Sequence, residues 1–157
     1  MEEMDAALEP LVDAFHRMQV QHARVLQHIA VRYALNPTDV RVLKYLGART
    51  AQESAATPGA VGDYLQMSRG AVTALLDRLE ARALVARRPN PEDRRGLLLE
   101  VSPAGRAVVA DLRAAYATAL EAGVPECSRR EVIEACEALQ VQLGALVAEP
   151  GASRGGG

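Results

Sequence analysis

The stretch SRGAVTALLDRLEARALVARRPNPEDRRGLLLEVSPAG, residues 68–105, decides the fold of this chain. Ser68 opens it as a good helix N-cap, because its hydroxyl can accept a hydrogen bond from an unpaired backbone N–H. Behind this cap, apolar residues recur at the i, i+3, i+4 and i+7 spacing of an amphipathic helix: Val72, Leu75, Leu76 and Leu79. When that stripe is buried, short side chains lie on or near the opposite face, at Gly70, Thr73, Ala74 and Asp77. The pattern therefore predicts a helix whose exposed face a neighbouring surface can approach closely.

Two short strands and a long turn follow this helix. The strands are predicted at 84–87 and 97–101, and the run between them, 89–96, has the composition of a turn, because Pro fixes φ while Asn, Asp and Gly tolerate turn conformations. The tip and base of this hairpin carry four arginines: Arg87, Arg88, Arg94 and Arg95. A slim helix beside such a hairpin suits double-stranded DNA, since the helix fits the major groove and the hairpin can reach the backbone or the adjacent minor groove.

The residues before Ser68 predict the first part of a helix-turn-helix. Asn-Pro opens a helix at 37–48, and Thr-Pro opens a short helix at 58–65 after a small, polar loop at 49–57. Residues 66–67 then make a tight turn into Ser68. A short helix, a turn and a second helix with an exposed small face form the arrangement that binds DNA. A simple helical hairpin is the alternative, and the arginine hairpin that follows immediately argues against it.

A long helical pattern precedes this region, at 4–33. Pro10 suits the first turn of a helix, so the regular helix begins there, and the preceding residues either pack separately or kink. A helix of this length exceeds what one small domain can bury. Its predicted buried positions are Leu8, Leu11, Val12, Phe15, Met18, Leu26, Ile29 and Tyr33.

Two more helices follow the hairpin. Ser102 caps the first, at 103–122, which Gly123 ends and whose apolar positions are Val108, Val109, Leu112 and Leu120. A capping box at 128–131 opens the last helix, in which Ser precedes Glu by three residues. The apolar positions of this last helix are Val132, Ile133, Leu139, Leu143 and Leu146. The remaining residues, 149–157, are rich in Gly and predict a disordered tail.

The order of these pieces resembles the MarR family of bacterial transcriptional regulators. The most specific matches are DRLE at 77–80 and the Asp-x-Arg of Asp93-Arg94-Arg95 in the hairpin, and the similarity extends to about Val147. The resemblance implies a mainly α fold with a small β-hairpin wing (α+β), a winged helix-turn-helix with long dimerisation helices at both ends. It assigns the parts as an N-terminal dimerisation helix, a winged helix-turn-helix DNA-binding lobe, C-terminal dimerisation helices and a tail, at 1–33, 34–101, 102–148 and 149–157.

The resemblance also implies a function. It implies a homodimeric, sequence-specific regulator of transcription, most often a repressor, that binds a pseudo-palindrome with half-site centres about 34 Å apart. The candidates for contacts with major-groove bases or adjacent phosphates are Ser68, Arg69, Gly70 and Thr73. Arg95 matches the family's minor-groove arginine, Asp93 orients it, and Arg94 and Arg87 are candidates for backbone contacts. Asp77 on the exposed face would repel phosphate, so we expect an arginine of the fold to pair with it.

Regulation in this family usually comes from a small, often phenolic ligand between the dimerisation helices and the DNA-binding lobe. The candidates to line such a cleft here are Met18, His22 and Tyr45. The aromatic content of 3% leaves few rings to stack on an aromatic effector, which argues against that ligand class in this chain.

The formal net charge of −2 argues weakly against nucleic-acid binding, so the distribution of charge matters more than the sum. Between Ser68 and Gly105 seven arginines stand against five carboxylates. Arginine suits bidentate contacts to phosphate and guanine better than lysine does. We expect Arg78 and Arg82 to pair within the fold, which leaves the excess of positive charge concentrated in the hairpin.

Length and composition limit the remaining classes. At 157 residues the chain is one domain by length, with an aliphatic, helical core. No apolar run reaches the roughly 18 residues that span a bilayer, and the acidic N-terminus lacks the features of a signal peptide. We therefore expect a cytoplasmic protein with no membrane partner.

The chain offers no grouping for catalysis. No glycine-rich strand–loop–helix and no Ser/His/Asp or Cys/His grouping is placed for chemistry, so we expect neither an enzyme nor a cofactor. His16, His22 and His28 recur every six residues, which displaces each by about 120° from the last and predicts no metal site. A regulatory zinc site, which some MarR relatives have, is the alternative, and it would need carboxylates from elsewhere.

Two points have alternatives: the role of the two cysteines and the class of molecule that the chain binds. Cys127 is predicted in a capping loop and Cys136 as a small buried residue, with a redox switch as the other interpretation. The main rival to a DNA-binding regulator is a winged-helix module that binds protein and not DNA.

Overall fold

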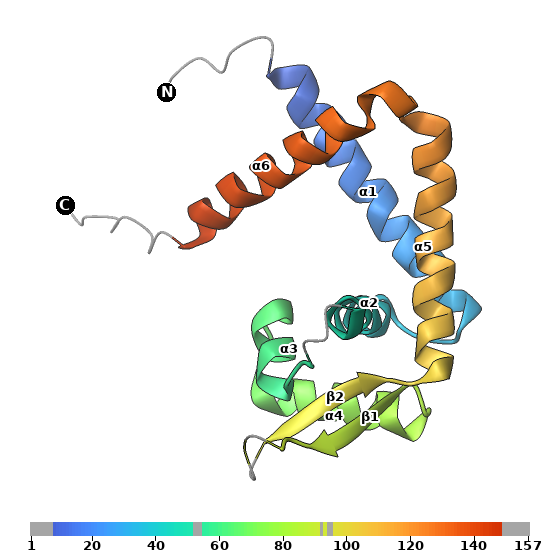
Figure 1. Ribbon diagram of the computed structural model, residues 1–157, viewed down its shortest axis with the longest axis vertical. Helices are drawn as coiled ribbons and strands as arrows, with labels where there is room; N and C mark the ends of the chain where they lie inside the picture. Colours follow the sequence, from blue (N-terminus) through green and yellow to red (C-terminus); the bar gives the residue numbers. More distant parts are fainter. Residues whose placement is uncertain (1–7, 52–54, 92, 94–95, 149–157) are drawn as a thin grey trace, which may run out of the picture. The chain divides into compact units, whose positions relative to one another are not determined.

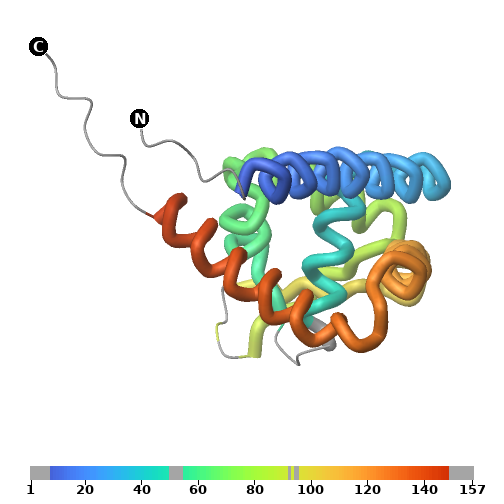
Figure 2. Tube along the Cα trace, turned by 90° about the horizontal axis from the view of Figure 1, so that it is seen from above, coloured from blue at the N-terminus to red at the C-terminus, as the bar shows by residue number. Residues whose placement is uncertain are grey.

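The computed structural model describes residues 8–51, 55–91, 93 and 96–148. It divides into two units, residues 1–115 and 116–157, with the boundary inside one helix. Figure 1 labels the elements, and Figure 2 follows the chain from blue to red. In chain order they are α1 (Glu9–Arg32), α2 (Pro37–Ala51), α3 (Pro58–Leu65), α4 (Arg69–Ala81), β1 (Val85–Pro89), β2 (Leu97–Val101), α5 (Pro103–Gly123), the short 3-10 helix η1 (Glu126–Ser128) and α6 (Arg129–Ala148). This mainly helical chain with one antiparallel hairpin confirms the predicted winged-helix fold.

The helix starts follow the capping residues in the sequence. The hydroxyl of Thr57 accepts a hydrogen bond from the backbone N–H of Ala60 (3.2 Å) at the start of α3. The hydroxyl of Ser68 accepts one from the N–H of Ala71 (3.4 Å) at the start of α4. Gln66, between these helices, adopts the left-handed conformation (φ 55°), which makes the turn tight. The predicted helix-turn-helix is therefore present.

Three predicted boundaries were wrong. Helix α2 continues to Ala51, three residues past the predicted end, because no Gly or Pro interrupts residues 48–51. Strand β1 begins at Val85 and not at Leu84, because the N–H of Leu84 bonds to the carbonyl of Leu79 (3.0 Å) and so belongs to the end of α4. The strand also runs on to Pro89, which pairs with Leu97.

The core of unit 1 is aliphatic, as the composition predicts. The apolar stripe of α4 is buried against it, with no member more than 3% exposed. The largest fully buried side chains come from α2, α4, β2 and α5, and include Leu43, Leu46, Leu76, Leu79, Leu99 and Leu112. Burial of each such leucine stabilises the fold by roughly 1.5–3 kcal/mol relative to exposure.

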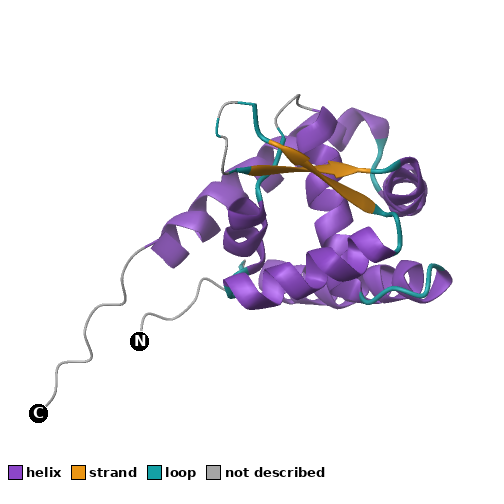
Figure 3. Ribbon diagram, turned by 90° about the horizontal axis from the view of Figure 1, so that it is seen from below, coloured by secondary structure: helices purple, strands orange, loops and turns teal. Residues whose placement is uncertain are grey.

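The hairpin is joined to this core on more than one side. Figure 3 shows its two strands paired in orange among the helices. The N–H of Leu99 donates to the carbonyl of Ala56 (2.8 Å), so the residues before α3 cover part of the outer edge of β2. At the start of α5, a Cβ on Gly105 would lie 2.3 Å from the carbonyl oxygen of Leu84 and 2.7 Å from a methyl group of Val101. Only glycine permits this approach between α5 and the hairpin.

The predicted burial of α1 was correct only for its C-terminal half. Leu26 and Ile29 are buried, as predicted, and Ala30 is buried in addition. Four predicted positions nearer the N-terminus are exposed by 38% to 64%, namely Leu8, Leu11, Val12 and Met18, while Phe15 and Tyr33 are half-buried. The physical reason is that no described segment of unit 1 covers this part of the helix.

The predicted burial of the C-terminal helices was also partly wrong. Val108 and Leu112 of α5 are buried, whereas Leu120 is 53% exposed. In α6 no described residue is buried, and the five predicted apolar positions are exposed by 39% to 70%. An apolar stripe predicts that a face becomes covered, but the described residues of unit 2 do not cover this one.

Candidate nucleic-acid interface

The first turns of α4 bring four of the candidate residues together. Ser68 caps the helix, and the next three candidates are exposed on its first two turns: Arg69, Gly70 and Thr73. A Cβ on Gly70 would meet nothing within 4 Å, so the surface there is open. The hydroxyl of Thr73 donates to the carbonyl of Arg69 (2.9 Å), which leaves its oxygen lone pairs available as acceptors. The face is slim and polar, as the sequence predicts.

A hollow of about 490 Å³ lies between α3 and this end of α4. Its lining combines small, apolar and polar side chains: Pro58, Gly59, Gly62, Asp63, Met67, Arg69, Val72 and Thr73. Two of the candidate residues, Arg69 and Thr73, therefore line this hollow as well as the exposed face of α4.

One flank of α4 is joined to β1 through Arg87. The guanidinium of Arg87 lies 2.7 Å from a carboxylate oxygen of Asp77 and 2.6 Å from one of Glu80. Burial alone would lower the pKa of Arg87, but the two carboxylates outweigh burial and the pKa is raised, so the charge persists at every physiological pH. The expected pairing of Asp77 with an arginine of the fold is confirmed. Arg87 thus binds the helix, and its predicted contact with the DNA backbone stays a prediction that competes with these ion pairs.

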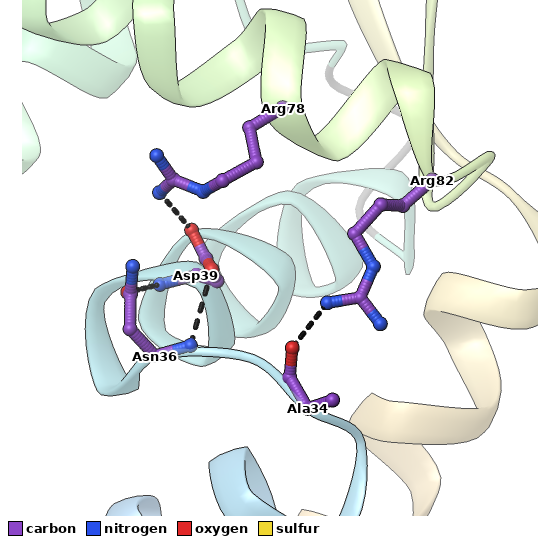
Figure 4. A network of polar contacts seen from close by, with 5 residues as sticks. All are labelled: Ala34, Asn36, Asp39, Arg78 and Arg82. Atoms are coloured by element: carbon purple, nitrogen blue, oxygen red, sulfur yellow. Dashed lines mark hydrogen bonds and ion pairs between the residues drawn. The ribbon is translucent and has the colours of Figure 1, made fainter.

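The other flank of α4 is joined to the corner between α1 and α2. Figure 4 shows Arg78 directed at Asp39, which lies beside Asn36 at the start of α2, while Arg82 points to Ala34. A guanidinium nitrogen of Arg78 lies 2.5 Å from a carboxylate oxygen of Asp39, which confirms the expected pairing. Arg82 also bonds within the fold, but its acceptors are backbone carbonyls, those of Ala34 and Tyr33.

The hairpin tip is described only in part. The N–H of Asn90 donates to the carbonyl of Gly96 (3.0 Å), and the N–H of Gly96 donates to that of Asp93 (2.8 Å), so hydrogen bonds close the turn. Asp93 is exposed, whereas Arg94 and Arg95 lie outside the described residues. The predicted minor-groove contact of Arg95 and backbone contact of Arg94 therefore stay predictions. Arg88, at the base, pairs with Glu100 across the strands (2.7 Å).

The three effector candidates lie outside the two hollows described in this structure. Met18 is exposed, and neither the hollow between α3 and α4 nor the hollow where α5 meets α6 is lined by Met18, His22 or Tyr45. His22 is half-buried, and its pKa is lowered by burial and then by the charges of Lys44 and Arg41. The predicted lining of an effector cleft stays untested.

Tyr45 is held by other side chains. Its ring stacks on that of Tyr64 with centroids 4.4 Å apart and planes 15° apart. The guanidinium of Arg49 lies over Tyr45, 5.5 Å from the ring centroid, and that of Arg41 lies 6.0 Å from the centroid of Tyr64. The sequence argument missed Tyr64. A single tyrosine in a short helix gives no periodic signal, and only the fold shows that it meets Tyr45.

Other sites considered from the sequence find little support in the structure. Among the described residues no group of three or more His, Cys, Asp or Glu is placed to hold a metal ion. Cys127 and Cys136 are both exposed, so the prediction of a buried Cys136 was wrong, because α6 buries none of its described residues. Within the same part of the chain no helix is long and apolar enough to span a bilayer.

Comparison with known proteins places the arrangement among transcription regulators. A family model for the MarR family matches residues 34–96. The HTH-type transcriptional regulator MhqR of Bacillus subtilis (strain 168) is 27% identical over 116 residues, which are 72% of this chain and 74% of MhqR. The multiple antibiotic resistance protein MarR of Escherichia coli (strain K12) is 30% identical over 100 residues, 63% of this chain and 66% of that protein.

Solved structures of the S. aureus protein MepR share the fold. A mutant from a multidrug-resistant clinical isolate aligns with a TM-score of 0.68 at 20% identity, over 93% of this chain and 99% of that one. Another mutant, bound to an oligodeoxyribonucleotide, aligns with a TM-score of 0.59 at 20% identity, over 86% and 97% of the two chains.

Proposed function

The chain belongs to the MarR family of DNA-binding transcription regulators, and we propose that it acts as a homodimeric repressor on a pseudo-palindromic operator. In this proposal 34–101 is the DNA-binding lobe, and 1–33 and 102–148 supply the dimerisation helices. The tail assigned to 149–157 lies outside the described residues. The chemistry required is binding alone, without an enzymatic step or a cofactor, in a cytoplasmic protein.

The observation that supports DNA binding best is the exposed start of α4. Ser68, Arg69, Gly70 and Thr73 are all exposed there, and the space around Gly70 is open, so α4 can enter a major groove as a recognition helix. The N-terminus of the helix also offers backbone N–H groups to a phosphate. The neutralisation of Asp77 by Arg87 removes a repulsion that would otherwise oppose the approach of DNA.

The hairpin supplies the second part of the proposed interface. We assign Arg95 to the minor groove with Asp93 as its orienting partner, and Arg94 to the phosphate backbone. Arginine inserted into a narrow minor groove is attracted by the strong negative potential there. The S. aureus MepR mutant bound to an oligodeoxyribonucleotide shares the fold that carries this hairpin, which supports the assignment of the surface.

Dimerisation is proposed from the exposed apolar side chains of the terminal helices. Leu11 and Met18 of α1 and Ile133, Leu143 and Leu146 of α6 are all more than 40% exposed. Two copies related by two-fold symmetry would present two recognition helices to half-sites with centres about 34 Å apart. An effector that changes their spacing, bound near Met18, His22 and Tyr45, would release the DNA.

DNA binding is tested by fluorescence anisotropy with a duplex that the wild-type protein selects from a random pool. Affinity should fall roughly a hundredfold or more as salt rises from about 50 to about 200 mM, because phosphate contacts release counterions. Replacement of both Arg94 and Arg95 by alanine should lower the affinity about tenfold or more. It should also reduce the slope against salt by about one for each phosphate that the variant no longer binds.

Arg113→Ala is the matched control, since it removes an exposed arginine from α5, away from the hairpin. A protein-binding winged helix predicts instead that no duplex is enriched and that the hairpin variant behaves as the wild type. That outcome would refute the proposed function in favour of the protein-binding module.

A further inference from the structure

We propose that Asp39 is a positioning residue for the recognition helix: through Arg78 it fixes α4 against the start of α2 and thereby sets the preference for one DNA sequence over another. The inference rests on the proposed DNA-binding function and deepens it. Asp39 itself is only 2% exposed, which is too buried for a contact with DNA, so its effect has to pass through Arg78.

The carboxylate of Asp39 does more than cap α2. One oxygen accepts from the backbone N–H of Asn36 (3.1 Å), and the other accepts from Arg78 (2.5 Å). A neutral amide at this position of a capping box would satisfy the first bond equally well. A buried carboxylate is strongly destabilising when its partner is missing. The negative charge is therefore explained by Arg78, and Asp39 is the only polar or charged side chain that is buried in the described part of the chain.

A second arginine extends this joint by one helical turn. Arg82 follows Arg78 by four residues, so both lie on the same side of α4. It donates to the carbonyl of Tyr33 (2.8 Å) and to that of Ala34, a residue held in the left-handed conformation (φ 50°) between α1 and α2. The two arginines hold α4 at the end of α1 and at the start of α2, and two attachment points along one side resist tilting as well as rotation.

The geometry of α4 makes base recognition sensitive to a small tilt. Arg69 lies nine residues before Arg78, which is about 13 Å along the helix axis. A tilt of about 5° around Arg78 would move the start of the helix by about 1 Å. N–H···O hydrogen bonds have donor–acceptor distances of about 2.7–3.2 Å, a window only about 0.5 Å wide, so this shift would break them. Attraction between arginine and phosphate acts over a Debye length of about 10 Å and is insensitive to such a shift. Removal of the joint should therefore reduce sequence preference and spare non-specific binding.

The test compares Asp39→Asn with Asn36→Ala. The first keeps the shape of the side chain and removes its charge. The second removes the side-chain acceptor that caps the N–H of Asp39 (2.9 Å) and leaves both bonds of the Asp39 carboxylate in place. Each variant is titrated, at a temperature where circular dichroism shows it folded, with the duplex selected by the wild type and with a scrambled duplex of the same composition.

We expect Asp39→Asn to lower the ratio of selected to scrambled affinity about tenfold, with the salt slope on the scrambled duplex unchanged. Asn36→Ala should lower the unfolding midpoint and leave the ratio within about twofold, since it weakens only a cap. The double variant Asp39→Asn with Arg78→Met provides the same measurement should Asp39→Asn not fold, because it leaves neither a buried carboxylate nor an arginine without its partner. This double variant should lower the ratio of selected to scrambled affinity no further than the stronger of the two single variants does.

An unchanged ratio in folded Asp39→Asn or in the folded double variant, or an equal fall on both duplexes, would overturn the positioning role. A wild-type protein that selects no duplex would overturn the proposed function itself, and the inference with it.

Discussion

Helices α4 and α6 carry similar apolar stripes, and the described residues of each helix's own unit cover only that of α4. The stripe of α4 is no more than 3% exposed, whereas the corresponding positions of α6 are 39% to 70% exposed. Both patterns predict an amphipathic helix, and both helices are present. The difference shows that periodicity predicts which face of a helix becomes buried, while the identity of the covering surface depends on the rest of the assembly.

The two stripes also differ in what surrounds them. Unit 1 supplies α4 with a closed core from α2, β2 and α5. Unit 2 supplies α6 with only the end of α5 and η1, and the hollow there is lined by Leu120, Val124, Arg129, Val132 and Ile133. Exposed apolar faces of this kind mark interaction sites, which is the basis for assigning α6 to a dimer.

The largest expected effect comes from the same truncation made on each stripe. Leu79→Ala should lower the free energy of unfolding by about 2–5 kcal/mol at every protein concentration, because it leaves a cavity in a closed core. Leu143→Ala should act only where dimers are populated, so its effect should depend on protein concentration. Urea unfolding followed by circular dichroism at several concentrations measures both. A concentration-independent effect of similar size at Leu143 would contradict the comparison.

Charge on the exposed stripe should separate the subunits. The double variant Leu139→Glu with Leu143→Glu should raise the dimer dissociation constant about a hundredfold, about 2.7 kcal/mol, because four carboxylates would have to be buried in the dimer. Analytical ultracentrifugation gives the constant. Ala138→Glu with Ala145→Glu adds the same charge on the far side of α6, where a 100° step per residue places both positions, and should leave the dimer intact. Equal dissociation in both double variants would argue against a dimer through this stripe.

Local chemistry predicted most of unit 1. Caps at Thr57 and Ser68 and the stripe from Val72 to Leu79 depend on neighbours in sequence, and the structure confirms each. The burial of Leu8 and Leu11 was wrong because it depends on a surface that unit 1 does not contain. The end of α2 was misplaced because the small and polar run after Ala48 was interpreted as a loop, although Arg49 favours helix and no Gly or Pro stops it before Ala51.

In the candidate interface, too, the features that depend on neighbours in sequence were predicted, and a feature that depends on a long-range contact was not. The exposure of Arg69, Gly70 and Thr73 followed from the period of one helix, so the sequence was sufficient. The sequence argument missed the role of Asp39, because its bond to Arg78 joins residues 39 positions apart. No local pattern encodes such a contact, and only the packing of α2 beside α4 reveals it.

Replacement of one glycine in each unit by alanine compares the closed core of unit 1 with the exposed helix α6 by the addition of a single methyl group. Gly105→Ala should destabilise the fold by about 1–3 kcal/mol, since its Cβ would lie 2.3 Å from the Leu84 carbonyl oxygen and neither backbone segment can move without disturbing the core. Gly144→Ala in α6 would meet nothing within 4 Å and should instead stabilise the helix by about 0.5–1 kcal/mol.

The decisive result is that Gly105→Ala lowers the free energy of unfolding and Gly144→Ala raises it. Alanine has the higher helix propensity at both positions, so the difference in sign has to come from the surroundings. Thermal unfolding of the two single variants and of the double variant gives the signs, and the two effects should add, since the two glycines lie in different units. Destabilisation at Gly144 would mean that a second surface packs closely there, as it would if the dimer interface extended beyond the apolar stripe. The alanine methyl group at position 144 would then show that the interface extends at least one residue beyond Leu143.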